Sequence, residues 1–261
     1  MCQYLGEGVL RIGTFPLCAG LGLLFIASYV YVSLTRFRVG EAVENKVMAA
    51  IPFTVLFGVL TGLASDVLFR GGFGALARLR LYGINFFGWL IGCIVFLCVY
   101  ARAAGLSRSF LLNTFLPPCA VAQAIGRIGC FCGGCCFGIP TRFGGVVYPP
   151  GSLPYSVYGA TPLVPVQLLE CVYLLALFAV LVFRVDFRRR AALYLMLAAA
   201  GRFGFEFLRG DHRGSVFDSV FSPAQCLGAA LFAFGLLMYL RPLRRPGFPP
   251  RGGDFSKNLL K

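Results

Sequence analysis

Arg127 is the residue of this sequence best suited to hold an anion, because it stands in a run rich in glycine. Glycine occupies positions 126, 129, 133, 134 and 138, and a residue without a side chain lets the backbone approach a ligand closely. A guanidinium presented there can hold a phosphate through two parallel hydrogen bonds. The alternative is that Arg127 merely extends its charged end to lipid headgroups. We predict a phosphate-binding role for Arg127, with Gly126 and Gly129 beside it.

Ionisable residues also fall inside long apolar runs, at Asp66, Glu170, Arg202 and Glu206. Charges in such runs are costly and usually face a partner or a water-filled cavity. Arg202 and Glu206 are four residues apart, so a helix places them on one face, where they can pair. A purely structural ion pair is the alternative reading of these two residues.

Four cysteines lie within seven residues, at Cys130, Cys132, Cys135 and Cys136. Thiolates bind zinc, Cu(I) or iron–sulfur clusters, but structural zinc sites usually combine two Cys-x2-4-Cys pairs, and no second pair is present. We therefore favour small packing residues or disulfides, assign no metal site and expect no cofactor. Metal binding or redox chemistry at these thiols is the alternative.

His212 is the only histidine of the chain, and we expect it to be an exposed loop residue. It has no serine-containing elbow motif to serve, which argues against a serine-type catalytic triad. If a proton must be removed in this protein, the acceptor is His212, a carboxylate or a thiolate.

The elements that position these residues are predicted to be membrane-spanning helices. The chain of 261 residues is 58% hydrophobic and 13% charged, with a mean hydropathy of +0.80, which excludes an ordinary soluble domain. Uncharged or nearly uncharged runs long enough to cross a bilayer occupy residues 12–35, 47–65, 81–101, 109–126, 164–183, 191–208 and 219–240. We predict an all-α integral membrane protein with about seven transmembrane helices. The net charge of +14 is spread between these runs, so we expect no nucleic-acid partner.

The distribution of positive charge predicts the orientation. With the N-terminus outside and the C-terminus cytoplasmic, fifteen of the 24 Lys and Arg residues fall on the inner face, as the positive-inside rule requires. Residues 1–240 are predicted to form a single transmembrane domain with an outer loop at 127–163. Residues 241–261 are predicted to form a basic, disordered cytoplasmic tail.

Three stretches of the chain, taken in order, resemble the bacterial prolipoprotein diacylglyceryl transferase family. Residues 123–141 are similar to the Gly-Arg-x-Gly-Asn-Phe signature of that family and to the Gly-x-Pro-Thr sequel of a cysteine-bearing branch. Residues 165–170 resemble its His-Pro-x-Gln-Leu-Tyr-Glu element. Residues 201–211, followed by 222–225, resemble its Arg-x3-Glu-Phe-x-Arg element and its Gln-bearing final span, and residues 86–92 are a fainter fourth match.

The resemblance implies a multi-pass enzyme of the bacterial plasma (inner) membrane that acts in lipoprotein biosynthesis. It would transfer the diacylglyceryl group of phosphatidylglycerol, a membrane lipid, to the lipobox cysteine thiol in the signal peptide of a prolipoprotein. The thiol must become a thiolate, and fixed cations must hold the departing phosphate. The catalytic residues implied are Arg127, Arg202 and Glu206. The substrate-binding residues implied are Arg127, Gly126, Gly129, Gln167, Glu170 and Arg209.

The sequence departs from the family pattern at several motif positions. Phe87 and Val164 stand where the family carries histidines, and Cys130 and Cys135 replace its Asn and Glu. An arginine of the family's second span corresponds to Leu63. The alternative function is therefore a catalytically altered relative that binds lipid, or that binds metal through its thiols. A transporter is a weaker option, because no pair of broken helices in inverted positions is visible.

Overall fold

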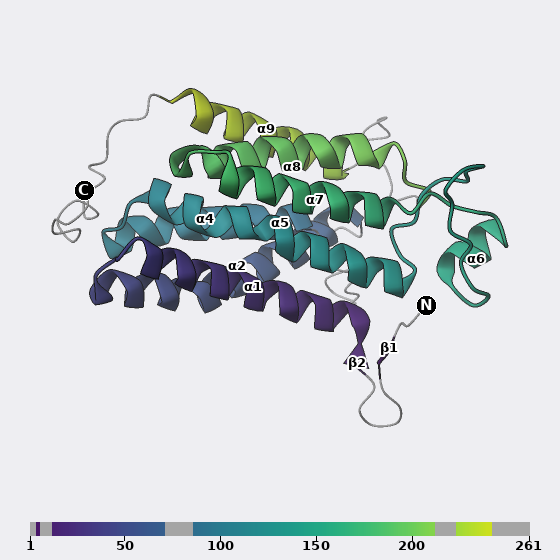
Figure 1. Cartoon of the computed structure of the whole chain (residues 1–261), viewed down its shortest axis with the longest axis horizontal. Helices are drawn as coiled ribbons and strands as arrows, with labels where there is room; N and C mark the ends of the chain where they lie inside the picture. The colour runs from purple at the N-terminus through teal and green to yellow at the C-terminus, as the bar shows by residue number, and fades with distance from the viewer. Residues whose placement is uncertain (1–3, 6–11, 71–85, 212–222, 242–261) are drawn as a thin grey trace.

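The computed structural model describes residues 4–5, 12–70, 86–211 and 223–241, which form long helices arranged side by side along one axis (Figure 1). The predictions for His212 and for residues 242–261 of the tail lie outside the described residues. So do residues 81–85 and 219–222, at the starts of two predicted spans.

Helices account for most of the described chain, and the all-α prediction is confirmed at this level. A short antiparallel pair of strands, β1 (Tyr4–Leu5) and β2 (Ile12–Gly13), precedes the helices. The helices are α1 (Thr14–Arg36), α2 (Glu41–Arg70), α4 (Phe86–Ala104), α5 (Arg108–Gly133), α6 (Leu153–Tyr158), α7 (Val166–Phe183), α8 (Arg190–Glu206) and α9 (Pro223–Leu240), with a 3-10 turn at Phe187–Arg189 before α8.

Five described helices are long and apolar enough to cross a membrane: α1, the Glu41–Ser65 part of α2, α4, α5 and α7. The described part of α9 from Gln225 to Leu240 is apolar but shorter. Each of these helices coincides with a run predicted from the sequence, since the same absence of charges defines both.

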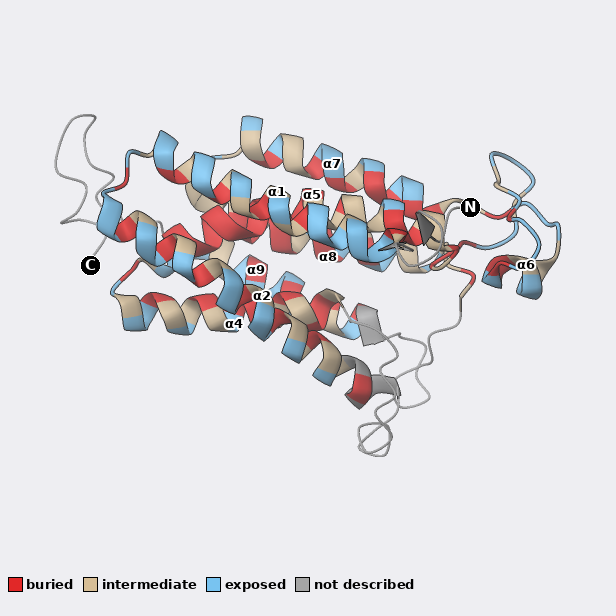
Figure 2. Cartoon of the chain, turned by 90° about the horizontal axis from the view of Figure 1, so that it is seen from below, coloured by how far each residue is buried: buried red, intermediate tan, exposed pale blue. Residues whose placement is uncertain are grey.

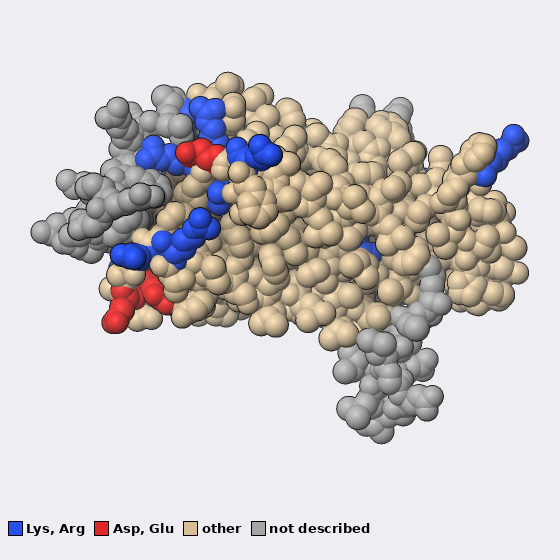
Figure 3. All heavy atoms as spheres, in the orientation of Figure 1, with Lys and Arg blue, Asp and Glu red and all other residues tan. Residues whose placement is uncertain are grey.

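The bundle is apolar outside as well as inside. Large apolar side chains such as Leu24, Val99 and Val172 are more than 60% exposed on the outer faces of α1, α4 and α7, while the inward-facing side chains are buried (Figure 2). Charged side chains gather near one end of the bundle, and the long middle of the visible face is almost free of them (Figure 3). This surface suits a chain surrounded by lipid.

Helix α5 is the central element, since it contacts α1, α4, α7 and α8. Its N-terminus is capped by Ser107, whose hydroxyl accepts a hydrogen bond from the Phe110 N–H. The buried Asn113 accepts a hydrogen bond of 2.8 Å from the backbone N–H of Ala191, which ties the start of α8 to α5. Polar and apolar contacts therefore fix α5 and α8 relative to each other.

The main difference from the predicted boundaries is at the end of α5. The helix continues past Gly126 to Gly133 and closes at Gly134, whose φ of 68° is left-handed, as is common at helix ends. Glycine disfavours helix by about 1 kcal/mol, but Gly129 packs closely against Phe15 and Cys18 of α1, where an added Cβ would lie only 3.1–3.3 Å from their atoms. Packing between the helices offsets the low propensity, so Arg127 lies on a helix and not in a loop.

Candidate functional site

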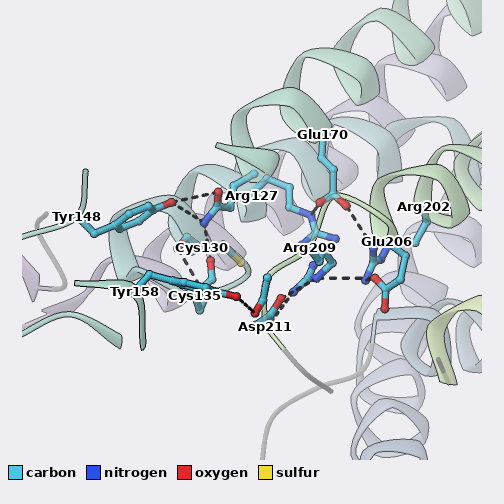
Figure 4. Close-up of polar contacts among 12 residues, drawn as sticks. Arg127, Cys130, Cys135, Tyr148, Tyr158, Glu170, Arg202, Glu206, Arg209 and Asp211 are labelled. Carbon is cyan, nitrogen blue, oxygen red and sulfur yellow. Dashed lines mark hydrogen bonds and ion pairs between the residues drawn. The ribbon is translucent and has the colours of Figure 1, made fainter. Parts of the chain in front are cut away.

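Arg127 lies in a buried network of ion pairs formed by α5, α7 and α8 (Figure 4). Its Nε pairs with a carboxylate oxygen of Glu170 on α7. The other oxygen of Glu170 lies 3.5 Å from Nη1 of Arg202 on α8, and Arg202 also pairs with Glu206 one helical turn later. One carboxylate thus joins two arginines from different helices, so the 202–206 pair is part of a larger ion-pair network.

Arg209 extends this network beyond the end of α8. Its Nε lies 3.7 Å from Glu206, and its Nε and Nη2 donate two parallel hydrogen bonds of 2.9 and 2.7 Å to Asp211. Burial tends to lower the pKa of Arg209, but the neighbouring Cys136 and Asp211 outweigh it and raise the pKa overall. Arg209 is therefore a permanent cation. The network as a whole contains three arginines and three carboxylates.

The charges are shielded from solvent, yet some polar atoms lack hydrogen-bond partners among the described residues. The side chains of Arg127 and Arg202 are only 11% and 8% exposed, and that of Glu170 is 4% exposed. Nη1 of Arg209 and Oε1 of Gln123 are buried without a hydrogen-bond partner in the described part of the chain. Buried polar atoms are normally paired, so these two offer a donor and an acceptor to a ligand.

A small pocket opens between α5, α7 and α8 beside this network. Its polar side is formed by Gln123, Glu170 and Arg202, and its apolar side by Tyr173, Leu174, Ala198 and Phe205. The pocket has room for only about one water molecule, but it brings charged and apolar side chains side by side.

The segment between α5 and α7 is tied to the helix ends by hydrogen bonds. Gln167 is completely buried, and its Nε2 donates a hydrogen bond of 2.7 Å to the Cys135 carbonyl. Its side-chain amide also forms hydrogen bonds with the Tyr148 hydroxyl. Burial raises the pKa of Tyr148, so its hydroxyl stays protonated. The sequence predicts Gln167 as a substrate-binding residue, and this stays a prediction. The hydrogen bonds of its side chain within the described residues go to the Cys135 carbonyl and the Tyr148 hydroxyl, so it positions the loop.

The position of Arg209 is fixed by backbone contacts with the same loop. The N–H of Gly210 donates a hydrogen bond of 2.9 Å to the Phe137 carbonyl, and the N–H of Gly138 donates one of 3.1 Å to the Val164 carbonyl. A Cβ on Gly138 would lie 2.5 Å from the Val164 carbonyl oxygen. Only glycine allows this close approach at position 138.

The structure brings together five residues singled out from the sequence: Arg127, Glu170, Arg202, Glu206 and Arg209. Two other predicted site residues lie elsewhere on α5. Gly126 faces open space. Gly129 faces α1, so close packing of α5 against α1 explains why position 129 is glycine. Asp66 lies on α2, outside this group of helices.

Three residues of the site were not selected from the sequence. Gln123 lines the pocket, Asp211 pairs with Arg209, and Tyr148 holds Gln167. A glutamine inside an apolar span is a signal that could have identified Gln123. Asp211 and Tyr148 lie in irregular segments, whose contacts do not follow from sequence periodicity.

The four clustered cysteines form no disulfide in the described part of the chain. The sulfurs of Cys130, Cys135 and Cys136 all lie within 4.8 Å of one another, while Cys132 is outside this group. The first two thiols occupy positions at which the sequence departs from the family signature.

Comparison with known proteins gives a consistent result over nearly the whole chain. A family model described as prolipoprotein diacylglyceryl transferase matches residues 4–241. The chain is similar to a phosphatidylglycerol–prolipoprotein diacylglyceryl transferase of Dehalococcoides mccartyi, with 28% identity over 250 residues that cover 91% of this chain and 92% of the relative. It is also similar to transferase 2 of Clostridium perfringens, with 27% identity over 88% of this chain and 91% of that protein. A transferase of Clostridium tetani is 31% identical over 60% of this chain and 63% of its own length.

Proposed function

Because the chain belongs to the prolipoprotein diacylglyceryl transferase family, we propose that it moves the diacylglyceryl group of phosphatidylglycerol onto the cysteine thiol of a prolipoprotein. The relatives are named for this reaction, and they match the chain over most of its length. The chemistry of the site is compatible with it, since three arginines stand next to apolar side chains and could exchange a carboxylate partner for the phosphate of an anionic lipid.

The proposed arrangement in the membrane has seven spans, with the N-terminus outside and the C-terminus in the cytoplasm. In this arrangement α8 and α9 cross the bacterial inner membrane beside the five longer spans. The transmembrane domain covers residues 1–240, and the basic tail from 241 onward lies at the inner leaflet. The gathering of charged residues at one end of the bundle supports this orientation (Figure 3).

The arginines are proposed to bind the phosphate of the lipid. Arg127 and Arg202 flank Glu170, and Arg209 supplies an Nη1 group that has no hydrogen-bond partner among the described residues. When the glycerol–phosphate bond breaks, negative charge grows on the phosphate oxygens, and fixed cations in a shielded site stabilise that charge. Gly126 leaves room for the headgroup on the same helix as Arg127.

The proposed reaction is a displacement at a glycerol carbon. The lipobox thiol gives its proton to a carboxylate, and its sulfur forms a bond to the glycerol carbon of the diacylglyceryl group. The bond from that carbon to the phosphate oxygen breaks, and glycerol phosphate leaves with the electron pair. Glu206 is the better placed acceptor, because its side chain is 13% exposed and that of Glu170 only 4%.

The single observation that carries the proposal is the convergence of three arginines on one buried site, within a chain of this family. The test is expression in a bacterium depleted of its own transferase, combined with transfer of labelled diacylglyceryl from phosphatidylglycerol to a lipobox peptide. We expect growth to be restored and label to enter the peptide. A variant of the exposed Arg142, Arg142→Ala, is the matched control and should remain active.

Failure of the wild-type protein in both assays, with the protein present in the membrane, would reject the proposal. Binding of phosphatidylglycerol without transfer would instead support the alternative of a non-catalytic lipid-binding relative.

A further inference from the structure

Three thiols converge at the end of α5, next to the arginine network. Cys130 lies in the last turn of the helix, and Cys135 and Cys136 lie in the turn that follows. Their sulfurs are within 4.8 Å of one another, and Cys130 and Cys136 are buried while Cys135 is partly exposed. Three sulfurs at tetrahedral positions around a zinc ion, each about 2.3 Å from it, are about 3.8 Å apart, so a small closure of this group is enough.

The backbone holds these thiols together at some conformational cost. Cys136 has a φ of 61°, a left-handed value that residues other than glycine seldom adopt, and Gly134 before it is left-handed as well. The N–H of Cys135 donates a hydrogen bond of 3.1 Å to the Cys130 carbonyl. The side chain of Gln167, on α7, donates a hydrogen bond to the Cys135 carbonyl. Such strain persists where the surrounding structure imposes it, and it occurs often at ligand sites.

The charge of the bound ion distinguishes the soft metals that could occupy this cluster. The Arg209 guanidinium, a permanent cation, lies beside the side chain of Cys136. Three thiolates with Zn²⁺ carry a net charge of about −1, whereas three thiolates with Cu⁺ carry about −2, and the smaller charge costs less to bury. Zinc is therefore the soft ion that this setting favours.

We propose that Cys130, Cys135 and Cys136 bind a zinc ion whose fourth coordination position takes the thiol of the protein substrate. Zinc sites with three protein ligands and one open position are typical of catalysis, and the partly exposed Cys135 marks the side from which a fourth ligand can enter. The identity of that fourth ligand rests on the proposed function, but the zinc site itself does not.

The zinc ion would supply what the reaction needs at this position. A zinc ion held by these three cysteines would lower the pKa of a coordinated substrate thiol, and Glu206 would accept its proton. The sulfur would then form its bond to the glycerol carbon, the electron pair of the carbon–oxygen bond would leave with glycerol phosphate, and the neutral thioether would be a weaker zinc ligand than the thiolate. Arg209 contacts both Cys136 and Glu206, so this single side chain would connect the proposed zinc site with the proposed phosphate site.

The first test measures zinc in the purified full-length protein. We expect about one zinc per chain, and at least a tenfold lower content in Cys130→Ser and Cys136→Ser. Cys132→Ser is the matched control, since Cys132 lies in the same segment but outside the three-thiol group, and it should retain zinc. Thermal unfolding of each variant in detergent separates loss of the ion from loss of the fold.

Two results of this test would overturn the proposal. One is wild-type protein that takes up no zinc even when zinc is supplied to the reduced thiols. The other is a disulfide among the three cysteines in protein isolated from the membrane, detected as two additional thiols after reduction.

The second test uses Co²⁺ in place of zinc and requires no catalysis. Thiolate-to-cobalt absorption grows with the number of bound thiolates, so a lipobox peptide with cysteine should raise it by about one third, from three thiolates to four. The same peptide with serine should leave it unchanged. A metal-loaded protein with the same absorption in both peptides would overturn the role of the fourth position. Failure of the transferase function would appear separately, as absence of label transfer in the zinc-loaded wild-type protein.

Discussion

At the scale of single residues, each buried arginine of the site is paired with at least one carboxylate. Glu170 is shared by Arg127 and Arg202, and Asp211 holds Arg209. Removing one partner from a buried pair leaves the other charge uncompensated, which commonly costs about 3–5 kcal/mol. Substitutions at these positions are therefore expected to have effects well above those of surface residues.

Arg127→Ala is expected to abolish use of phosphatidylglycerol, because the phosphate loses a cation and Glu170 loses its partner. Loss of one fixed group that stabilises developing charge commonly lowers the rate about 10²- to 10³-fold, and a fall of this size is expected in kcat/KM. Arg127→Lys keeps the charge but not the planar pair of donors, and it should retain only part of the activity. The measurement is label transfer at equal protein levels. Full activity of Arg127→Ala would contradict the assigned role.

Glu206→Gln is expected to lower kcat more than it changes KM. The amide keeps the shape of the side chain and can still contact Arg202, but it cannot accept the proton of the thiol. The steady-state rates of Glu206→Gln and Glu170→Gln should be compared over a range of pH. A kcat for Glu206→Gln equal to that of the wild type would exclude Glu206 as the proton acceptor.

Gln167→Ala is expected to destabilise the segment between α5 and α7 by about 1–3 kcal/mol, because the Cys135 carbonyl and the Tyr148 hydroxyl lose a buried partner. The melting temperature of the purified protein measures this effect. Ser156→Ala, at an exposed position in α6, is the control and should melt like the wild type. Equal melting temperatures for Gln167→Ala and the control would show that this side chain does not hold the loop.

At the scale of elements, the site depends on close approach between backbones. Gly138 lies against Val164 just before α7, and Gly210 lies against Gly138 just after α8. These contacts determine where Arg209 stands relative to the end of α5. A glycine at such a contact is a positional requirement and not a sign of a flexible loop.

Gly138→Ala is expected to destabilise the protein by about 1–3 kcal/mol, because its Cβ would lie 2.5 Å from a backbone oxygen that cannot move aside easily. Gly133→Ala is the matched control, since a Cβ there meets nothing within 4 Å. Thermal unfolding and label transfer are the two measurements. If both variants behave alike, the close approach at position 138 has no energetic importance.

The sequence predicted the helices well and the site in part. Charge-free runs locate the spans because lipid excludes charged residues, and the spacing of Arg202 and Glu206 correctly placed them on one helix face. The pairing of Arg127 with Glu170 could not be derived in this way, since it depends on which helices become neighbours. The sequence also predicts too early an end for α5, because packing of Gly129 against α1 compensates for the low helix propensity of glycine.

At the scale of the whole molecule, the bundle has a charged end and an end that carries the loop with α6 (Figures 1 and 3). Phe143, in the irregular segment between α5 and α6, is 89% exposed. The loop and the site network lie at the same end of α5, because Arg127 stands in the last two turns of this helix and the loop begins where the helix ends. In the proposed orientation this end faces the outside, where a secreted prolipoprotein emerges.

The proposed orientation predicts that an epitope inserted after Gly144 is accessible to antibody in spheroplasts. An epitope at the C-terminus should react only after the inner membrane is permeabilised. Position 144 suits the insertion, because it lies in an exposed turn with a left-handed φ of 63°. The opposite pattern of accessibility would require an inverted topology.

The sharing of Glu170 also has a consequence for the order in which the protein is made. Translation delivers Arg127 with α5, well before α7 brings the carboxylate that neutralises it and before α8 brings Arg202 and Glu206. A nascent chain that ends before α7 therefore presents an uncompensated cation near the bilayer. Such a chain should remain beside the insertion machinery until the later helices emerge, and truncation before Glu170 should lead to degradation of the fragment.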